Sequence, residues 1–204
     1  MTILKRQVVG IMGSGTDPQP ELAIPLATWI AEQNYHLLTG AGEGVMTAAS
    51  KAFCEVENRQ GICIGIVPTE QNNEGQFVAK TGYPNPWVEL SITSPLPTFQ
   101  GANKKQVSRN HICVLSSDVI VALPGNKGTR NEVMLAQKFH KPIILFGWKN
   151  IIRDLPRTIE RTSDLERVQS FICSHLETCH GANAANPNQL HNQGHNEENP
   201  TKQN

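Results

Sequence analysis

The stretch SSDVIVALPGNKGTRNE, residues 116–132, joins an apolar segment to a glycine-rich one and decides the fold. Its first half is rich in β-branched residues and predicts a buried strand over 118–124. VMLAQKF, residues 133–139, follows with the spacing of a helix. A plain strand-to-helix connection needs one turn residue, whereas PGNKGTR contains a proline and two glycines. The stretch therefore predicts a strand, a helix and, between them, a loop whose backbone is left open for a ligand.

The same order of strand, loop and helix repeats along the chain. Apolar runs predict strands over 7–13, 35–40, 61–68, 87–93, 118–124 and 141–147, and amphipathic runs predict helices over 21–33, 45–57, 103–116 and 162–179, with a polar loop over 69–86. Pro25 is expected to start the first helix or to kink it, and Ser163 or Asp164 to cap the last one. Buried strands that alternate with helices predict an α/β fold, a Rossmann-like doubly wound parallel sheet in a three-layer αβα sandwich.

Composition divides the chain into two parts. Residues 1–180 have the length and apolar content of a single Rossmann-like ligand-binding domain. Residues 181–204 are almost free of large apolar side chains and predict a disordered polar tail. His191 and His195 lie in this tail, where a solvated polar segment explains them more simply than a metal site does. No metal site is predicted in the chain.

Charge and cysteine content narrow the functional classes. The formal net charge is zero, so no global field attracts the protein to nucleic acid or to a membrane surface. No apolar run approaches the roughly 20 residues of a membrane helix, and the first residues do not resemble a signal peptide. The cysteines, Cys54, Cys63, Cys113, Cys173 and Cys179, are predicted to be reduced thiols. We therefore expect a cytoplasmic protein that has neither a nucleic-acid nor a membrane partner.

Three glycine-rich segments follow strands whose carboxyl ends share one edge of the predicted sheet. They are GIMGSGT (10–16), TGAGEGVM (39–46) and PGNKGTRNE (124–132). In an open parallel sheet ligands bind beyond this edge, and the amide groups of helix N-termini favour anions. The segments therefore predict a site for phosphate or another anion. The candidate binding residues in them are Gly13, Ser14, Gly15, Thr16, Thr39, Gly40, Gly42, Gly44, Pro124, Gly125, Asn126, Lys127, Gly128, Thr129 and Arg130.

Two ionisable residues, Arg109 and Glu132, complete the candidate site. The arginine can form a forked pair with phosphate oxygens, and the carboxylate can accept ribose hydroxyls or act as a base. Each also has a plainer interpretation, a solvated surface charge for Arg109 and compensation of the helix dipole in a first turn for Glu132. The absence of a GxxxxGK[ST] motif disfavours a P-loop ATPase. Thr39 stands where a dinucleotide-binding fold has a ribose-binding acid, which disfavours NAD.

The segment PGNKGTRNE resembles the P-G-G-x-G-T-x-x-E signature of the "lonely guy" family of cytokinin-activating phosphoribohydrolases. TGAGEGVM is similar to the G-G-G-x-x-G-x-M loop of the same family, and the likeness spans roughly residues 7–147. In that family an arginine nine residues before the Asp of the preceding strand assists catalysis, and counting back nine from Asp118 lands on Arg109. The final glutamate of the signature corresponds to Glu132. The resemblance implies that these two residues would be catalytic in a hydrolase.

Several positions depart from the hydrolase pattern. Asn126 replaces the second glycine, Asn131 stands where a further glutamate is usual, and Asn110 follows the arginine in place of lysine. With the opening VVGIMGSG (8–15), these positions look more like a sister branch, the molybdenum cofactor carrier proteins. This resemblance implies the same fold, a homo-oligomer (dimer or tetramer), and binding of the cofactor without turnover.

The resemblance leaves two main functions open. The first is a carrier or storage protein that protects the molybdenum cofactor (molybdopterin) and delivers it to molybdoenzymes or insertases. In it, charge would come from Arg109, Lys127 and Arg130, and hydrogen bonds from Ser14, Thr16 and Thr129. The alternative is a nucleoside 5′-monophosphate phosphoribohydrolase. An anion- or nucleotide-sensing domain is a third possibility.

Overall fold

The computed structural model describes residues 6–97, 107–148 and 155–176 of the chain. Its helices are α1 (Pro20–Glu32), α2 (Val45–Cys54), α3 (Arg109–Ser116), α4 (Lys127–Lys138) and α5 (Leu165–His175). Its strands are β1 (Val8–Met12), β2 (His36–Thr39), β3 (Cys63–Gln71), β4 (Phe77–Ala79), β5 (Leu90–Ser94), β6 (Val119–Ala122), β7 (Ile143–Phe146) and β8 (Glu160–Thr162). The predicted tail, residues 181–204, lies outside these ranges.

All strands belong to one 8-stranded sheet with the order β4-β3-β2-β1-β6-β7-β8, in which β5 also pairs with β3. The pairs are parallel except for the antiparallel pair of β3 and β4. In the centre, Val9 of β1 lies between Leu37 of β2 and Val119 of β6. The predicted doubly wound α/β fold is therefore confirmed. Because β2, β1 and β6 are neighbours and parallel, their carboxyl ends lie side by side.

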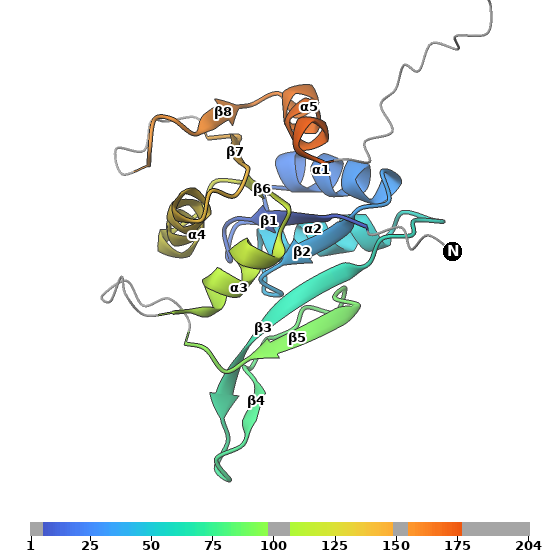
Figure 1. Cartoon of the computed structure of the whole chain (residues 1–204). Helices are drawn as coiled ribbons and strands as arrows, with labels where there is room; N and C mark the ends of the chain where they lie inside the picture. The colour runs from blue at the N-terminus through green and yellow to red at the C-terminus, as the bar shows by residue number, and fades with distance from the viewer. Residues whose placement is uncertain (1–5, 98–106, 149–154, 177–204) are drawn as a thin grey trace, which may run out of the picture.

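Helices cover both faces of the sheet (Figure 1). One core cluster joins α1, α2 and α5 to the sheet through side chains such as Leu26, Phe53 and Phe171. The other joins α3 and α4 to the opposite face through side chains such as Val114 and Val133. No helix among the described residues is long and apolar enough to cross a membrane.

The structure corrects several predicted element boundaries. The segment 69–86, predicted as a loop, contains the end of β3 and all of β4, which form the hairpin that projects from the sheet (Figure 1). Of the helix predicted over 103–116, residues 103–106 lie outside the described ranges, and α3 begins at Arg109, where Ser108 and His111 form a capping box. The first helix starts at Pro20 and continues through Pro25.

The last helix begins at one of its two predicted caps. Asp164 is its N-cap, since the Asp164 side chain accepts a hydrogen bond from the amide of Glu166 at 2.9 Å. The helix predicted over 162–179 ends at His175, and residues 177–179 lie outside the described ranges.

The cysteines differ in their state. Cys54, Cys63 and Cys113 are free thiols, whereas Cys173 is disulfide-bonded, so the prediction of a reduced thiol is wrong at Cys173.

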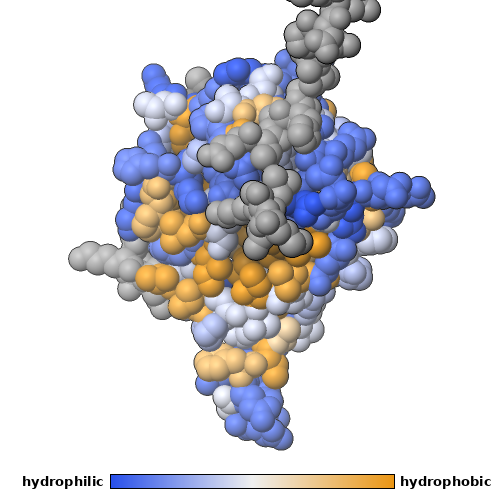
Figure 2. Space-filling model, turned by 45° about the vertical axis from the view of Figure 1, so that its right-hand side comes forward, coloured by the Kyte–Doolittle hydropathy of each residue, from blue (hydrophilic) through white to orange (hydrophobic). Residues whose placement is uncertain are grey.

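The face of the sheet that carries α3 and α4 is only partly covered. The core cluster on this face holds Ile66 of β3, and Ile64 packs at its margin. Beside them Leu90 and Ile92 of β5 are 45% and 41% exposed, and they pair in register with Ile64 and Ile66. Figure 2 shows apolar surface gathered in a band above the projecting hairpin. An apolar sheet surface of this kind is typical of a contact with another protein surface.

Candidate functional site

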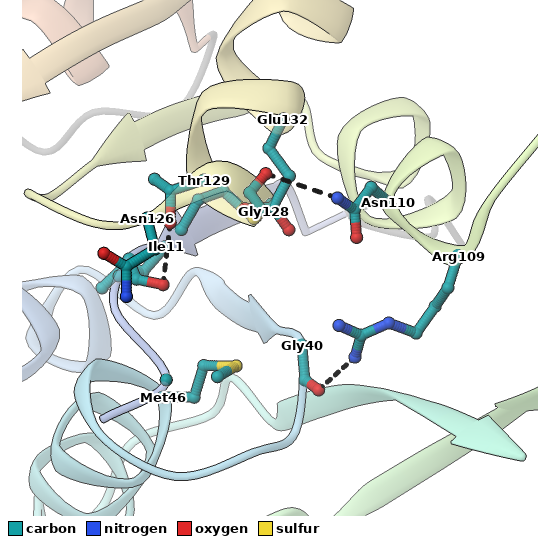
Figure 3. Close-up of a pocket in the computed structure, with 12 residues that line it drawn as sticks. Ile11, Gly40, Met46, Arg109, Asn110, Asn126, Gly128, Thr129 and Glu132 are labelled. Atoms are coloured by element: carbon teal, nitrogen blue, oxygen red, sulfur yellow. Dashed lines mark hydrogen bonds between the residues drawn. The ribbon is translucent and has the colours of Figure 1, made fainter. Parts of the chain in front are cut away.

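The glycine-rich loops after β1, β2 and β6 enclose a cavity of about 160 Å³ at the carboxyl edge of the sheet. Figure 3 shows Met46 of α2, Arg109 of α3 and Glu132 of α4 around this cavity, each from a different helix. The residues that line it are Ile11, Met12, Gly13, Gly15, Gly40, Met46, Arg109, Asn110, Asn126, Gly128, Thr129 and Glu132. The segments predicted to converge are therefore neighbours in the structure.

Short contacts fix the loops to one another. The Thr129 hydroxyl donates a hydrogen bond to the Gly13 carbonyl at 2.9 Å and joins the third loop to the first. The amide of Val45 donates to the Ser14 carbonyl at 2.9 Å and joins the second loop to the first. Gly44 adopts a φ of 64°, and a Cβ there would lie 2.4 Å from the Ser14 carbonyl oxygen. Only glycine therefore permits this approach of the two loops.

The N-terminus of α4 opens toward the cavity. The first hydrogen bond of this helix runs from the amide of Arg130 to the carbonyl of Asn126, at 3.1 Å. The amide groups of Lys127, Gly128 and Thr129 therefore have no carbonyl partner within the helix. Asn126 and Gly128 are exposed and line the cavity. Free amides and the positive end of the helix dipole make this helix start a favourable place for an anion.

Arg109 is a buried cation at the edge of the cavity, with 9% of its surface exposed. Its Nη1 donates to the carbonyl of Gly40 and, at 2.9 Å, to the carbonyl of Ile66. Its Nε is buried and has no hydrogen-bond partner among the described residues. The guanidinium lies 5.9 Å from the centre of the Tyr83 ring. A buried guanidinium with an unsatisfied donor suits an anionic ligand, because a forked pair with that ligand would satisfy it.

Glu132 is a buried carboxyl group, 7% exposed, in the second turn of α4 rather than in the predicted first turn. Burial raises the pKa of the Glu132 carboxyl to about 7, against a smaller lowering by the Arg109 guanidinium. The Glu132 carboxylate and the Arg109 guanidinium, both among the described residues, do not form an ion pair within 4.0 Å. Burial therefore favours the protonated form of this carboxyl group, which can donate as well as accept a hydrogen bond.

Asn110 and Asn131, two departures from the hydrolase pattern, are in contact. The Asn110 side-chain amide donates to the Asn131 side-chain oxygen at 3.0 Å. It also lies 3.4 Å from the carbonyl of Gly128 (Figure 3). This neutral pair links the start of α3 to α4 directly beside the cavity.

The predicted binding residues fall into two groups in the structure. Those that line the cavity are Gly13, Gly15, Gly40, Arg109, Asn126, Gly128, Thr129 and Glu132. Those that do not line it are Ser14, Thr16, Thr39, Gly42, Gly44, Pro124, Gly125, Lys127 and Arg130. Many of the second group shape the loops: the Ser14 hydroxyl accepts the amide of Asp17, and the Thr39 hydroxyl accepts the amide of Ala41. Arg109 is not the solvated surface charge that one interpretation allowed.

Some lining residues are absent from the sequence prediction. Ile11 and Met12 belong to β1, Met46 to α2 and Asn110 to α3. These apolar residues have the character of ordinary core residues, although Ile11 and Met12 lie in the GIMGSGT segment and Met46 in the TGAGEGVM segment. The Met46 sulfur accepts a hydrogen bond from the amide of Gly42 at 3.4 Å, which orders the second loop.

A second, larger and more open cavity of about 700 Å³ lies on the other side of the second loop. Thr16, Gly44 and Tyr83 contribute to its walls. Tyr83 also lies close to Gly42 and to the guanidinium of Arg109, a residue that lines the first cavity. Among the described residues no group of three or more His, Cys, Asp or Glu side chains is placed to hold a metal ion.

The chain has known relatives. The chain is similar to the molybdenum cofactor binding protein of Rippkaea orientalis, with 29% identity, a TM-score of 0.64, and coverage of 84% of this chain and 98% of that one. It is also similar to the Moco carrier protein of Chlamydomonas reinhardtii, with 25% identity, a TM-score of 0.62, and coverage of 83% and 99%. An uncharacterized protein of Archaeoglobus fulgidus is 24% identical over 155 residues, which are 72% of this chain and 88% of that protein. A family model matches residues 6–178, and the chain belongs to the SLOG cluster4 family.

Proposed function

We propose that this protein binds the molybdenum cofactor and carries or stores it without chemical turnover. The observation that carries the proposal is the buried Arg109 guanidinium, whose Nε has no partner among the described residues, beside the open N-terminus of α4. The cofactor ends in a phosphate, the kind of group that such a cation and such free amides hold. The likeness to a molybdenum cofactor binding protein and to a Moco carrier protein supports this choice of ligand.

The sizes of the two cavities support a binding mode in which each cavity holds a different part of the cofactor. The smaller cavity, about 160 Å³, suits a phosphate group held by the amide of Gly128 and by Arg109, both of which line it. The larger one, about 700 Å³, has room for the pterin. Tyr83 lines the larger cavity near Arg109 and offers an aromatic face against which a flat ring would pack. In this arrangement the protein surrounds the oxidation-prone part of the cargo and releases it to molybdoenzymes or insertases.

The second candidate function is a nucleoside 5′-monophosphate phosphoribohydrolase. One observation favours it: the raised pKa of about 7 at Glu132 is typical of groups that transfer protons in catalysis. Two observations weigh against it. Asn131 is engaged by Asn110 and supplies no second carboxylate. Asn126 places a side chain at the cavity wall where the hydrolase pattern has glycine.

The test begins with protein purified anaerobically from a host that makes molybdenum cofactor. We expect the wild type to carry molybdenum and pterin, detected by metal analysis and mass spectrometry, and Arg109→Ala to carry several-fold less. A second arm incubates the wild type and Glu132→Gln with AMP and follows free adenine by chromatography. We expect no adenine. Adenine release that disappears in Glu132→Gln would assign the protein to the hydrolases, and a protein that does neither would overturn both functions.

We also propose that a second copy of the chain covers the partly exposed sheet face, as a dimer or within a tetramer. The support is the pair of exposed apolar side chains Leu90 and Ile92 on an edge strand beside the core cluster of α3 and α4. Light scattering at micromolar concentration should give an oligomer for the wild type and a smaller species for Leu90→Asp combined with Ile92→Asp. Phe77→Asp is a matched control, because Phe77 is 58% exposed on the projecting hairpin. A monomeric wild type would exclude the proposal.

A further inference from the structure

Glu132 is the one acid among the described residues that line the smaller cavity. It is 7% exposed, and no hydrogen bond or ion pair joins its carboxyl group to another described residue. Buried carboxylates are normally paired or hydrogen-bonded, because an isolated ionised group is costly to remove from water. The partner of this carboxyl group therefore comes from outside the described residues, as a proton or as a bound ligand.

Two ionisable groups of α3 act on Glu132 or respond to it. Arg109 lines the same cavity and is itself 9% exposed (Figure 3). Burial raises the pKa of the Glu132 carboxyl to about 7, and the Arg109 guanidinium lowers it by less. Cys113 lies near both residues, and burial raises the pKa of its thiol to about 12, so it stays neutral around pH 7. Arg109 is thus the charge that opposes protonation of Glu132.

The other elements that pack against α4 bring no further charge to the cavity. The strands β6 and β7 are in contact with α4 and consist of uncharged residues. The residues that β1 and α2 contribute to the cavity wall are also uncharged. His111 of α3 packs against Phe139, at the other end of α4. On α4 itself, Lys127 and Arg130 do not line the cavity. The charge of the cavity wall is therefore set by Arg109 and Glu132.

An anion in the cavity changes the balance between the two forms of Glu132. The cavity measures only about 160 Å³, so a bound anion lies close to both Arg109 and Glu132. The guanidinium attracts the anion, whereas an ionised carboxylate in the same poorly solvated space repels it. A protonated carboxyl group removes this repulsion and can donate its O–H to an oxygen of the anion. The protonated form of Glu132 is therefore the form that is compatible with a bound anion.

We propose that Glu132 couples anion binding to a proton: the cavity holds an anion only while this carboxyl group is protonated. Above neutral pH, where the free carboxyl group is ionised, each anion that binds takes up one proton from solvent. The coupling rests on the proposed function, because the same site holds the phosphate group of the cargo. It adds a means of release, since a rise in pH weakens the hold on that phosphate.

The direction of the pH effect follows from the pKa of Glu132. This pKa is about 7 in the free protein, and the negative charge of a bound anion raises it further. The affinity is therefore full below about pH 7 and falls above it, approaching tenfold for each pH unit, because the free protein loses a proton that the complex keeps.

Isothermal titration with sulfate tests the coupling on the full-length protein. Sulfate keeps its charge around pH 7, unlike a phosphate ester, whose second pKa is about 6. We expect the affinity of the wild type to fall about tenfold between pH 6 and pH 8. Titrations at pH 8 in two buffers with different enthalpies of ionisation should show the uptake of about one proton for each sulfate bound.

Two variants identify the group that carries the proton. Glu132→Gln keeps a neutral donor of the same size that cannot titrate, so its affinity for sulfate should be equal at pH 6 and pH 8, with no proton uptake. Lys127→Ala is the matched control, because it removes an exposed charge whose residue does not line the cavity. It should keep the wild-type fall in affinity. Thermal melting followed by circular dichroism shows whether each variant folds.

Three results for the wild type would overturn the coupling: equal affinities at pH 6 and pH 8, no proton uptake at pH 8, or no sulfate binding at pH 6. A fall in affinity that persists in folded Glu132→Gln would also overturn it, since another group would then carry the proton. These results do not depend on the molybdenum cofactor. A protein that shows the coupling but is purified without molybdenum and pterin would contradict the proposed function alone.

Discussion

The helices α2 and α4 both begin at the carboxyl edge of the sheet after a glycine-rich loop, and their first turns differ in what they contact. The first amide of α2, that of Val45, is already bonded to the carbonyl of Ser14. The first amides of α4, those of Lys127 and Gly128, have no carbonyl partner within the helix, and Gly128 lines the cavity.

The glycines of the two loops differ in the same way. A Cβ at Gly44 would overlap the backbone of the first loop, with the carbonyl oxygen of Ser14 only 2.4 Å away. A Cβ at Gly128 would have nothing within 4 Å. Similar glycine-rich sequences therefore serve close packing at the start of α2 and open access at the start of α4.

The largest expected effect is that of Gly44→Ala. The φ of 64° and the overlap with Ser14 both oppose a side chain, so we expect a loss of at least about 3 kcal/mol in the free energy of unfolding. Urea denaturation followed by circular dichroism measures it. A loss below about 1 kcal/mol would mean that the starts of α2 and α4 tolerate a side chain equally well, and the contrast between the two loops would be wrong.

Next in size is the pH dependence at Glu132. Burial raises the pKa of the folded carboxyl to about 7, above its ordinary value of 4.5, so the native state binds this proton more tightly than the unfolded state. The stabilisation is fully present below about pH 4.5 and is lost as the pH rises through about 7, with a limit of about 3 kcal/mol. Glu132→Gln should remove this pH dependence. Between pH 5 and pH 8 the free energy of unfolding of the variant, measured by urea denaturation, should therefore rise relative to that of the wild type. If the free energies of unfolding of the two proteins change with pH in the same way, the pKa of Glu132 is not raised in the folded protein.

A smaller effect is expected on anion binding. Arg109→Ala should weaken the binding of sulfate by about tenfold, because it removes a charge-assisted contact. Lys127→Ala is the matched control: it removes a nearby exposed charge whose residue does not line the cavity, and it should change the affinity less than about twofold. Isothermal titration at constant pH measures both. Equal losses would show that general charge, and not the buried guanidinium, attracts the anion.

The smallest expected effect is that of Gly128→Ala on stability. The position lies in the first turn of α4 with open space around it, so alanine should change the free energy of unfolding by less than about 1 kcal/mol, in the stabilising direction. The measurement is the same urea denaturation as for Gly44→Ala. A clear loss of stability would mean that the N-terminus of α4 is packed as tightly as that of α2.

Sequence patterns predicted the fold because alternating strands and helices specify it locally. The apolar run after Asp118 gave β6, and the glycine loops gave the correct edge of the sheet for the cavity. Other features depend on contacts between distant segments. The hairpin of β3 and β4 is predicted as a loop because β4 has only three residues, Phe77–Ala79, all of them exposed, and is too short to show an alternating pattern. Likewise, the burial of Arg109 follows from its contact with the carbonyl of Ile66, far away in the chain.

The hydrogen bond between Asn110 and Asn131 has a consequence for the evolutionary history of the site. In the hydrolase pattern these positions usually carry a lysine and a glutamate, and here two amides occupy them in direct contact. A lysine at position 110 or a glutamate at position 131, introduced alone, would face an uncharged asparagine at this partly buried contact. It would gain no counter-ion. The two positions therefore favour changing together. Lysine at 110 and glutamate at 131 introduced together would supply opposite charges to each other, whereas neither substitution alone would.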